Sequence, residues 1–344
     1  MKVFRYAENF ALESGHVLHG FHLGYTTRGK LNEDASNVLW VFHALTANSD
    51  PLEWWPGLVG EGKLFDPVKY FIVCVNMPGS CYGSIGPLDK NGATGEPYYH
   101  DFPAITVRDM VRMYQLLRIQ LGINRIYLGI GGSMGGQQLL EWAVSEPSLF
   151  ELIVPVATNA FHSPWAIAFN ATQRHAIELD ASWKEKNGSA GMEGMKVARG
   201  IALLSYRNYS TYKLGQSEAD DEKTADFRSE SYQRYQGEKL AKRFNAFSYY
   251  FLSRSMDSHN LGRSRESVPA ALASVQAKAL VISISSDILF PPGEQRFLAN
   301  HIPAAEYHSI DSDYGHDGFL LECEQIANAI ETKLLLQKTI LTGA

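Results

Sequence analysis

The chain has 344 residues, which is enough for two domains or for one α/β core that carries an insertion. Its apolar content of 45% supports a large core, and its net charge of −6 argues against nonspecific binding to nucleic acid or to an anionic membrane. No stretch is apolar over the length that spans a bilayer, and the N-terminus lacks a signal-peptide pattern. The three cysteines show no C-x-x-C spacing and fit a reducing compartment, so we expect a cytoplasmic protein.

The first part of the chain alternates between strand and helix patterns. Residues 1–42 are predicted to form antiparallel strands and then the continuous apolar run Val38–Phe42, which is typical of a central strand covered on both faces. A second buried strand at 70–76 leads into the loop 77–87, whose small residues fit either the border of a substrate channel or a plain surface loop. A helix with one apolar stripe is predicted over 107–121.

The stretch around Ser133 joins a buried strand at 126–130 to a helix at 137–146. Gly131 and Gly135 flank the serine as G-x-S-x-G, which lets the strand and the helix approach closely and leaves the serine exposed at the edge of the sheet. This pattern predicts a nucleophile elbow, the turn that carries the serine of Ser-His-Asp acyl chemistry. The alternative is the glycine-rich turn of a nucleotide loop, but the Walker A lysine and the full G-x-G-x-x-G pattern are absent.

The pattern changes after residue 158. Residues 159–265 lack apolar strands and contain charged helical segments, whereas the strand pattern resumes beyond them. We therefore expect a core domain of residues 1–158 and 266–344 and a helical lid of residues 159–265 over the carboxyl edge of the sheet, where open α/β sheets bind ligands. A separate helical domain without a catalytic part is the alternative. The predicted lid helices are 166–178, 194–206 and 230–255.

Two residues after later strands are candidates for the acid and the base. A serine hydroxyl needs a base to take its proton during attack, and a neutral imidazole oriented by a carboxylate suits that task. Asp287 follows a predicted strand at 279–284, and His316 follows one at 306–310, in the α/β-hydrolase order of nucleophile, acid and histidine. We therefore predict a triad of Ser133, His316 and Asp287. Three rival acids lie too near the histidine in sequence to fill the acid position: Asp311, Asp313 and Asp317.

Two backbone N–H groups are candidates for an oxyanion hole. In a fold with a nucleophile elbow, one comes from the residue after the nucleophile and the other from the loop after an early central strand. Met134 and Leu45 hold those positions, although residues 43–48 also fit a plain loop. The elements and the triad order together predict an α/β-hydrolase fold with a mostly parallel central sheet and an inserted helical lid.

The chain resembles the homoserine O-acetyltransferase family, acyltransferases of methionine biosynthesis in the α/β-hydrolase superfamily. The likeness covers nearly the whole chain. The stretches that carry it are His43-Ala44-Leu45-Thr46, Gly131-Gly132-Ser133-Met134-Gly135-Gly136-Gln137, Ala198-Arg199, Ser205-Tyr206, Tyr235-Gln236-Gly237, Ser286-Asp287-Ile288-Leu289-Phe290-Pro291 and Gly315-His316-Asp317. The chain departs from the family pattern at Cys81-Tyr82 and Ala47-Asn48.

The resemblance implies a reaction and an acceptor site. Ser133 would take an acetyl group from acetyl-CoA and pass it to the hydroxyl of L-homoserine by a ping-pong mechanism. The family match implies that Arg199, assisted by Tyr206, binds the acceptor's carboxylate and that Asp317 binds its ammonium group. The spacing agrees, because residues seven apart project from one face of a helix. From the residues alone, a solvated lid arginine at Arg199 and a helix N-cap at Asp317 stay open.

The resemblance also implies acetyl-CoA as a co-substrate, no metal and no permanently bound cofactor, and a homodimer formed through the lid helices. An aromatic-rich stretch is a candidate for the dimer surface or for the lid core: Tyr232, Tyr235, Phe247, Tyr249, Tyr250 and Phe251. Two alternatives share the scaffold, a succinyltransferase acting on homoserine or serine and a carboxylesterase that uses water. Arg199 and Tyr206 argue against the esterase, which needs no amino acid clamp.

Overall fold

A computed structural model of the protein describes residues 1–335. Within these residues the strands form one eight-stranded sheet in the order β1-β2-β4-β3-β5-β6-β7-β8. The β1–β2 and β2–β4 pairs are antiparallel, and the remaining neighbours are parallel, so the predicted mostly parallel sheet is confirmed. The strands are β1 (Lys2–Ala11), β2 (Val17–Arg28), β3 (Val38–Phe42), β4 (Phe71–Val75), β5 (Ile126–Gly132), β6 (Phe150–Val156), β7 (Lys278–Ile284) and β8 (Ala305–Ile310).

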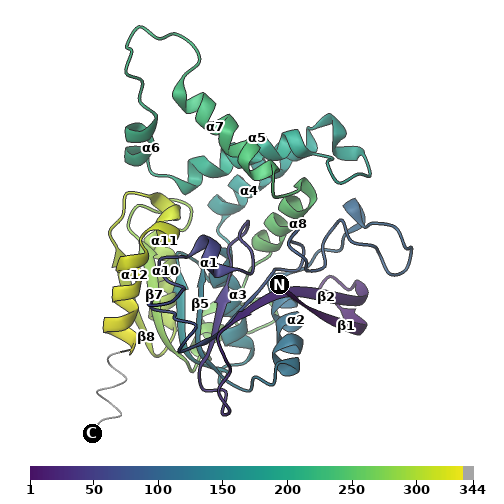
Figure 1. Ribbon diagram of the computed structural model, residues 1–344, viewed down its shortest axis with the longest axis vertical. Coiled ribbons are helices and arrows are strands. Elements are labelled where there is room, and N and C mark those ends of the chain that lie inside the picture. The colour runs from purple at the N-terminus through teal and green to yellow at the C-terminus, as the bar shows by residue number, and fades with distance from the viewer. Residues whose placement is uncertain (336–344) are drawn as a thin grey trace.

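Helices cover both faces of this sheet (Figure 1). Those of the core are α1 (Pro51–Trp54), α2 (Val107–Gln120), α3 (Met134–Ser145), α9 (Val268–Ala273), α10 (Pro292–His301), α11 (Gly318–Leu321) and α12 (Cys323–Ile330). Those between β6 and α9 are α4 (Pro164–Glu178), α5 (Met192–Tyr206), α6 (Tyr209–Gln216), α7 (Arg228–Ala241) and α8 (Ala246–Asp257). Short turns of helix are η1 (Tyr99–Asp101), η2 (Ala181–Lys184), η3 (Gly315–Asp317) and η4 (Glu331–Leu335). In residues 1–335 no helix is both long and apolar enough to cross a membrane.

Strand β3 shows how the core forms. Its five residues are all buried, and alternate side chains point to opposite faces because the side-chain period of a strand is two. Trp40 and Phe42 pack edge-on against Trp142 of α3, with ring centroids 4.9 and 6.0 Å apart. Leu39 and Val41 belong to a second buried cluster, on the face that α12 covers. The prediction of a central strand buried on both faces is therefore confirmed.

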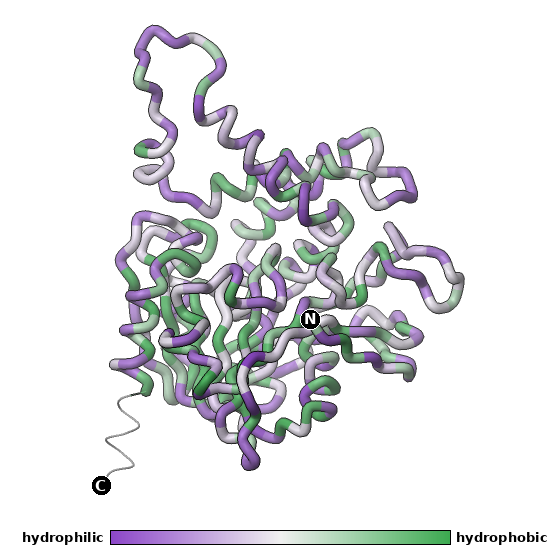
Figure 2. The backbone as a smooth tube through the Cα atoms, in the orientation of Figure 1, coloured by the Kyte–Doolittle hydropathy of each residue, from purple (hydrophilic) through white to green (hydrophobic). Residues whose placement is uncertain are grey.

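The helices α4 to α8 lie together beyond one edge of the sheet (Figure 1). The predicted segment 230–255 is divided into α7 and α8, because Asn245 begins a new helix by accepting a hydrogen bond from the N–H of Ser248 at 2.8 Å. Of the aromatic side chains expected at a dimer surface or in a lid core, Phe247 and Tyr249 are fully buried, whereas Tyr235 is 58% exposed. Figure 2 shows that the loop between α6 and α7 is mostly hydrophilic.

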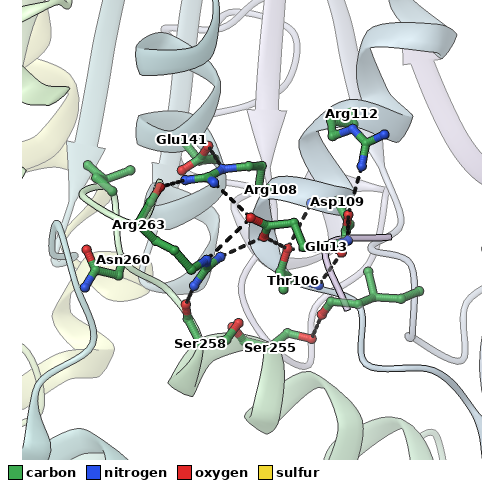
Figure 3. A network of polar contacts seen from close by, with 12 residues as sticks. Glu13, Thr106, Arg108, Asp109, Arg112, Glu141, Ser255, Ser258, Asn260 and Arg263 are labelled. Carbon is green, nitrogen blue, oxygen red and sulfur yellow. Dashed lines mark hydrogen bonds and ion pairs between the residues drawn. The ribbon is translucent and has the colours of Figure 1, made fainter. Parts of the chain in front are cut away.

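A network of charges ties the chain after α8 to the core (Figure 3). Glu13 accepts hydrogen bonds from Arg263 at 2.7 Å and from Arg108 of α2 at 2.8 Å. Glu141 of α3, whose side chain is buried, accepts from Arg108 at 2.8 Å and from Arg265 at 2.6 Å. Because each buried charge has an opposite charge within hydrogen-bond distance, the desolvation cost is offset. The network holds the end of the helical insertion against α2 and α3.

Candidate active site

Ser133 sits in a strained backbone conformation between β5 and α3. Its φ of 55° and ψ of −127° lie outside the regions that non-glycine residues favour, at a cost of about 1–3 kcal/mol. Hydrogen bonds of its backbone hold it there: its N–H donates to the carbonyl of Val156 at 3.0 Å, and its carbonyl accepts from the N–H of Gly136 at 2.9 Å and from the hydroxyl of Thr158 at 2.8 Å. The neighbouring strand and helix thus fix the serine at the end of the sheet.

The two flanking glycines are required by close backbone contacts. A Cβ atom on Gly131 would lie 2.4 Å from the carbonyl oxygen of Gly135, and a Cβ atom on Gly135 would lie 2.2 Å from the carbonyl oxygen of Phe42. Neither contact is possible for real atoms, so only glycine lets α3 approach β3 and β5 this closely. The G-x-S-x-G spacing therefore has the structural basis that the sequence predicted.

The three predicted triad residues lie within hydrogen-bond distance of one another. His316 Nε2 is 2.9 Å from Ser133 Oγ, and His316 Nδ1 is 2.7 Å from Asp287 Oδ2. All three are at least 95% buried. The second carboxylate oxygen, Oδ1 of Asp287, accepts from the N–H groups of Leu289 and Phe290 at 2.8 and 2.9 Å. These bonds fix the carboxylate, which leaves Oδ2 to orient the imidazole.

Aromatic rings hold the imidazole of His316 in place, and the rival acids face elsewhere. The Phe290 ring stacks on the imidazole with centroids 5.0 Å apart, and the Phe319 ring lies at 5.2 Å. Asp311 accepts from the hydroxyl of Ser285 at 3.0 Å, and Asp313 is exposed. The carboxylate within reach of His316 Nδ1 is that of Asp287.

The buried, neutral side chain of His43 supports the loop that follows β3. The buried ring of His43 accepts from the N–H of Met77 at 3.0 Å through Nε2, so Nδ1 carries the proton and donates to the carbonyl of Ala44 at 2.9 Å. Burial lowers the pKa of His43 to about 4, which keeps the ring neutral. Leu45 follows in this loop, and Met134 opens α3, whose first N–H groups have no partner within the helix. The two predicted oxyanion donors thus lie in segments that flank Ser133.

One cavity of about 620 Å³ joins the serine to the helices of residues 159–265. Ser133, His316 and Leu45 line it from the core, and Arg199 and Tyr206 line it from α5. This volume is in the range of small-molecule sites. Residues 159–265 therefore contribute side chains to the same cavity as Ser133 and His316.

Arg199, Tyr206 and Asp317 meet at the cavity's side. The guanidinium carbon of Arg199 lies 5.5 Å from the Tyr206 ring centroid, and that ring is 5.7 Å from the imidazole of His316. Burial raises the pKa of Tyr206, so its hydroxyl remains a neutral hydrogen-bond donor. Asp317 stands at the N-cap position of α11, but its side chain makes no capping hydrogen bond there. It pairs instead with Nε of Arg207 at 3.1 Å.

Sequence reasoning did not find two arginines in or beside the cavity. Arg243, which follows α7, lines the cavity, and Arg207 is the partner of Asp317, which also lines it. Nη1 of Arg243 donates to the carbonyl of Thr46, in the loop after β3, and to the hydroxyl of Tyr82 at 2.6 Å. Arg207 had a signal, because it follows Tyr206 directly, whereas no spacing rule connects Arg243 with residues about 160 to 200 positions earlier.

Comparison with known proteins agrees with this architecture. The family described as the alpha/beta hydrolase fold matches residues 37–322. A solved homoserine O-acetyltransferase from Bacillus anthracis is 26% identical with a TM-score of 0.87, and each chain is covered over 96% of its length. A solved mutant of esterase E22 has the same TM-score at 24% identity, covering 96% of this chain and 97% of the other, which shows the common fold alone.

The fold and the order of its elements therefore define an α/β-hydrolase-fold protein. Curated relatives identify a more specific family within this fold. The homoserine O-acetyltransferase of Cyclobacterium marinum is 51% identical over 94% of this chain and 92% of its own length, and that of Chlorobaculum tepidum is 42% identical over 94% and 91%. The chain belongs to the homoserine O-acetyltransferase family.

Proposed function

We propose that this protein moves an acetyl group from acetyl-CoA to the hydroxyl of L-homoserine, as a step of methionine biosynthesis. The observation that carries the proposal is the hydrogen-bonded chain of Ser133, His316 and Asp287 at the base of a cavity that Arg199 and Tyr206 also line. The names of the relatives, which cover nearly the whole chain, support homoserine as the acceptor.

In the first half-reaction, Ser133 Oγ attacks the thioester carbonyl carbon while His316 Nε2 takes the hydroxyl proton. Asp287 stabilises the imidazolium that forms. The oxyanion accepts hydrogen bonds from the backbone N–H groups of Leu45 and Met134. As the carbon–sulfur bond breaks, the imidazolium returns its proton to the leaving sulfur, which leaves as CoA thiol, and the acetyl group stays on the serine as an ester.

In the second half-reaction, the homoserine hydroxyl gives its proton to His316 and attacks the acetyl ester. The Ser133 oxygen then leaves and regains a proton from the imidazolium. Arg199 and Tyr206 hold the acceptor's carboxylate, since a guanidinium fork and a neutral phenol both donate to it. The ammonium group of the acceptor forms an ion pair with the carboxylate of Asp317. This carboxylate is also paired with Arg207. Burial raises the pKa of Asp317, and the charge of Arg207 opposes that shift.

We extend the proposal to the organisation of the chain. Residues 159–265 act as a lid on the core of residues 1–158 and 266–344, because α5 supplies acceptor-binding groups while the core supplies the triad. The lid also pairs two copies of the protein, through apolar side chains on α5 that face outward: Val197 and Leu204 are 58% and 57% exposed. Cytoplasmic location and the lack of a permanently bound cofactor or metal stay predictions.

The free thiol released from acetyl-CoA, followed with and without homoserine, tests this function. The proposal predicts steady release only with homoserine present, and formation of O-acetylhomoserine in equal amount. Steady release without an acceptor would support a hydrolase that uses water. Faster turnover with succinyl-CoA would support a succinyltransferase. Faster turnover with serine in place of homoserine would support serine as the acceptor.

A further inference from the structure

A second, smaller pocket opens beside the acyl-transfer cavity and is lined by cations. It has a volume of about 260 Å³ and lies between α7, the end of α5 and α11. Four of its lining side chains are basic and one is acidic: Arg199, Arg207, Lys239, Arg243 and Asp317. Arg199, Arg243 and Asp317 line the acyl cavity as well, so the two pockets are contiguous.

The local charge is opposite to that of the whole protein. The chain carries a net charge of −6, yet this pocket gathers four cations around a single carboxylate. Asp317 forms an ion pair with Arg207, at 3.1 Å, and its charge also acts on Arg199. Lys239 is exposed and makes no ion pair within the part of the chain that the structure describes. Like charges held together repel, so an arrangement of this kind is stabilised when an anion binds between them.

Arg243 is positioned to bind an anion without leaving its present contacts. Its Nη1 atom donates hydrogen bonds to the carbonyl of Thr46 and the hydroxyl of Tyr82. A guanidinium carries five N–H donors, and those on its other two nitrogens make no hydrogen bond within residues 1–335. A phosphate accepts two such bonds in parallel. Because the contacts to Thr46 and Tyr82 fix the side chain, little conformational entropy is lost when the anion binds.

We propose that this pocket binds the diphosphate group of the coenzyme A thioester, an inference that rests on the acyl donor of the proposed function. Ser133 and His316 line the larger cavity and not this one, as expected if a pantetheine arm separates the thioester from its phosphates. The pocket is less than half the size of the acyl cavity, which suits a diphosphate and not the whole nucleotide. Lys239, Arg207 and Arg243 bind the phosphates, while Arg199 stands at the boundary and serves the acceptor.

Lys239→Glu tests the inference, with Lys242→Glu as its matched control. Both lysines are exposed and lie at the end of α7, but only Lys239 lines the pocket. The affinity for CoA is measured by calorimetry, and kcat/KM is measured with acetyl-CoA and with S-acetylpantetheine, which has the thioester and the arm but no phosphate. We expect Lys239→Glu to weaken CoA binding about ten-fold or more, because an attractive charge becomes repulsive. S-acetylpantetheine turnover stays unchanged, which also shows that the variant is folded.

Three results would overturn the inference: unchanged CoA affinity in Lys239→Glu, an equal loss in Lys242→Glu, or a raised KM for homoserine with an unchanged KM for acetyl-CoA. Added salt provides a second readout, since screening weakens CoA binding by the wild-type protein more than by Lys239→Glu. The proposed function can be refuted independently of this binding site. A protein that binds CoA through Lys239 but never transfers its acyl group to homoserine would refute the function and leave this site standing.

Discussion

Replacing Asp287 by asparagine isolates one hydrogen bond of the triad. The carboxylate's Oδ1 accepts from the N–H groups of Leu289 and Phe290, and an amide oxygen keeps both bonds. The amide nitrogen then faces His316 Nδ1, 2.7 Å from the present carboxylate oxygen. Because that nitrogen donates, Nδ1 must accept and the ring proton moves to Nε2. The Nε2 atom, 2.9 Å from Ser133 Oγ, then cannot take the serine proton.

The expected loss is large, and folding is expected to survive. The wrong tautomer and the missing countercharge lower turnover by about 10³- to 10⁴-fold, which corresponds to about 4–5.5 kcal/mol of barrier. Turnover is measured as homoserine-dependent CoA release, and thermal unfolding of the same sample checks the fold. Asp311→Asn is the matched control, since that carboxylate accepts from Ser285 and does not face the imidazole. A loss of less than about ten-fold in Asp287→Asn, or a greater loss in Asp311→Asn, would refute this reasoning.

Three further predictions concern the acceptor clamp, pH and assembly. At saturating acetyl-CoA, Arg199→Ala and Asp317→Asn should leave the rate of acylation, measured by rapid quench, nearly unchanged. They should lower kcat/KM for homoserine by about 10²-fold, because a buried charge loses its partner. Slowed acylation with intact homoserine dependence contradicts this prediction. Burial raises the pKa of Glu294 to about 7, so the folded state favours its protonated form and the free energy of unfolding should fall from about pH 4.5 to about pH 7. Urea unfolding should show that Glu294→Gln removes this part of the fall, and an identical pH profile in both proteins contradicts it. Val197→Glu combined with Leu204→Glu should convert a dimer into monomers in sedimentation, and a wild-type monomer would exclude the dimer.

The turn at Ser133 and the segments that carry Asp287 and His316 could be located from local sequence rules. Gly131 and Gly135 are required by backbone contacts within a few residues of the serine and with the adjacent strand, so a short pattern carries the information. Asp287 follows β7, whose apolar run is buried, and His316 follows β8, a short strand of which only Ile310 is buried. The sequence therefore located the segments whose side chains the structure brings together.

The lid was less predictable, for physical reasons. The eight residues of α6 include none that is buried, so no hydrophobic period marks this helix. The break between α7 and α8 does carry a local signal in Asn245, which caps the second helix, but the charged pattern around it conceals the boundary. Contacts such as Arg207 with Asp317 and Arg243 with Tyr82 join irregular segments far apart in the chain, and packing of the whole insertion decides them.

The central claim is that Ser133 carries the acyl group between donor and acceptor. Incubation with acetyl-CoA alone, followed by acid quench and peptide mass spectrometry, measures this directly. We predict an acetyl mass on the peptide that contains Ser133, lost on addition of homoserine with the appearance of O-acetylhomoserine, and absent from Ser133→Ala. An acetyl group found only on another peptide, or full transfer activity in Ser133→Ala, would contradict the account.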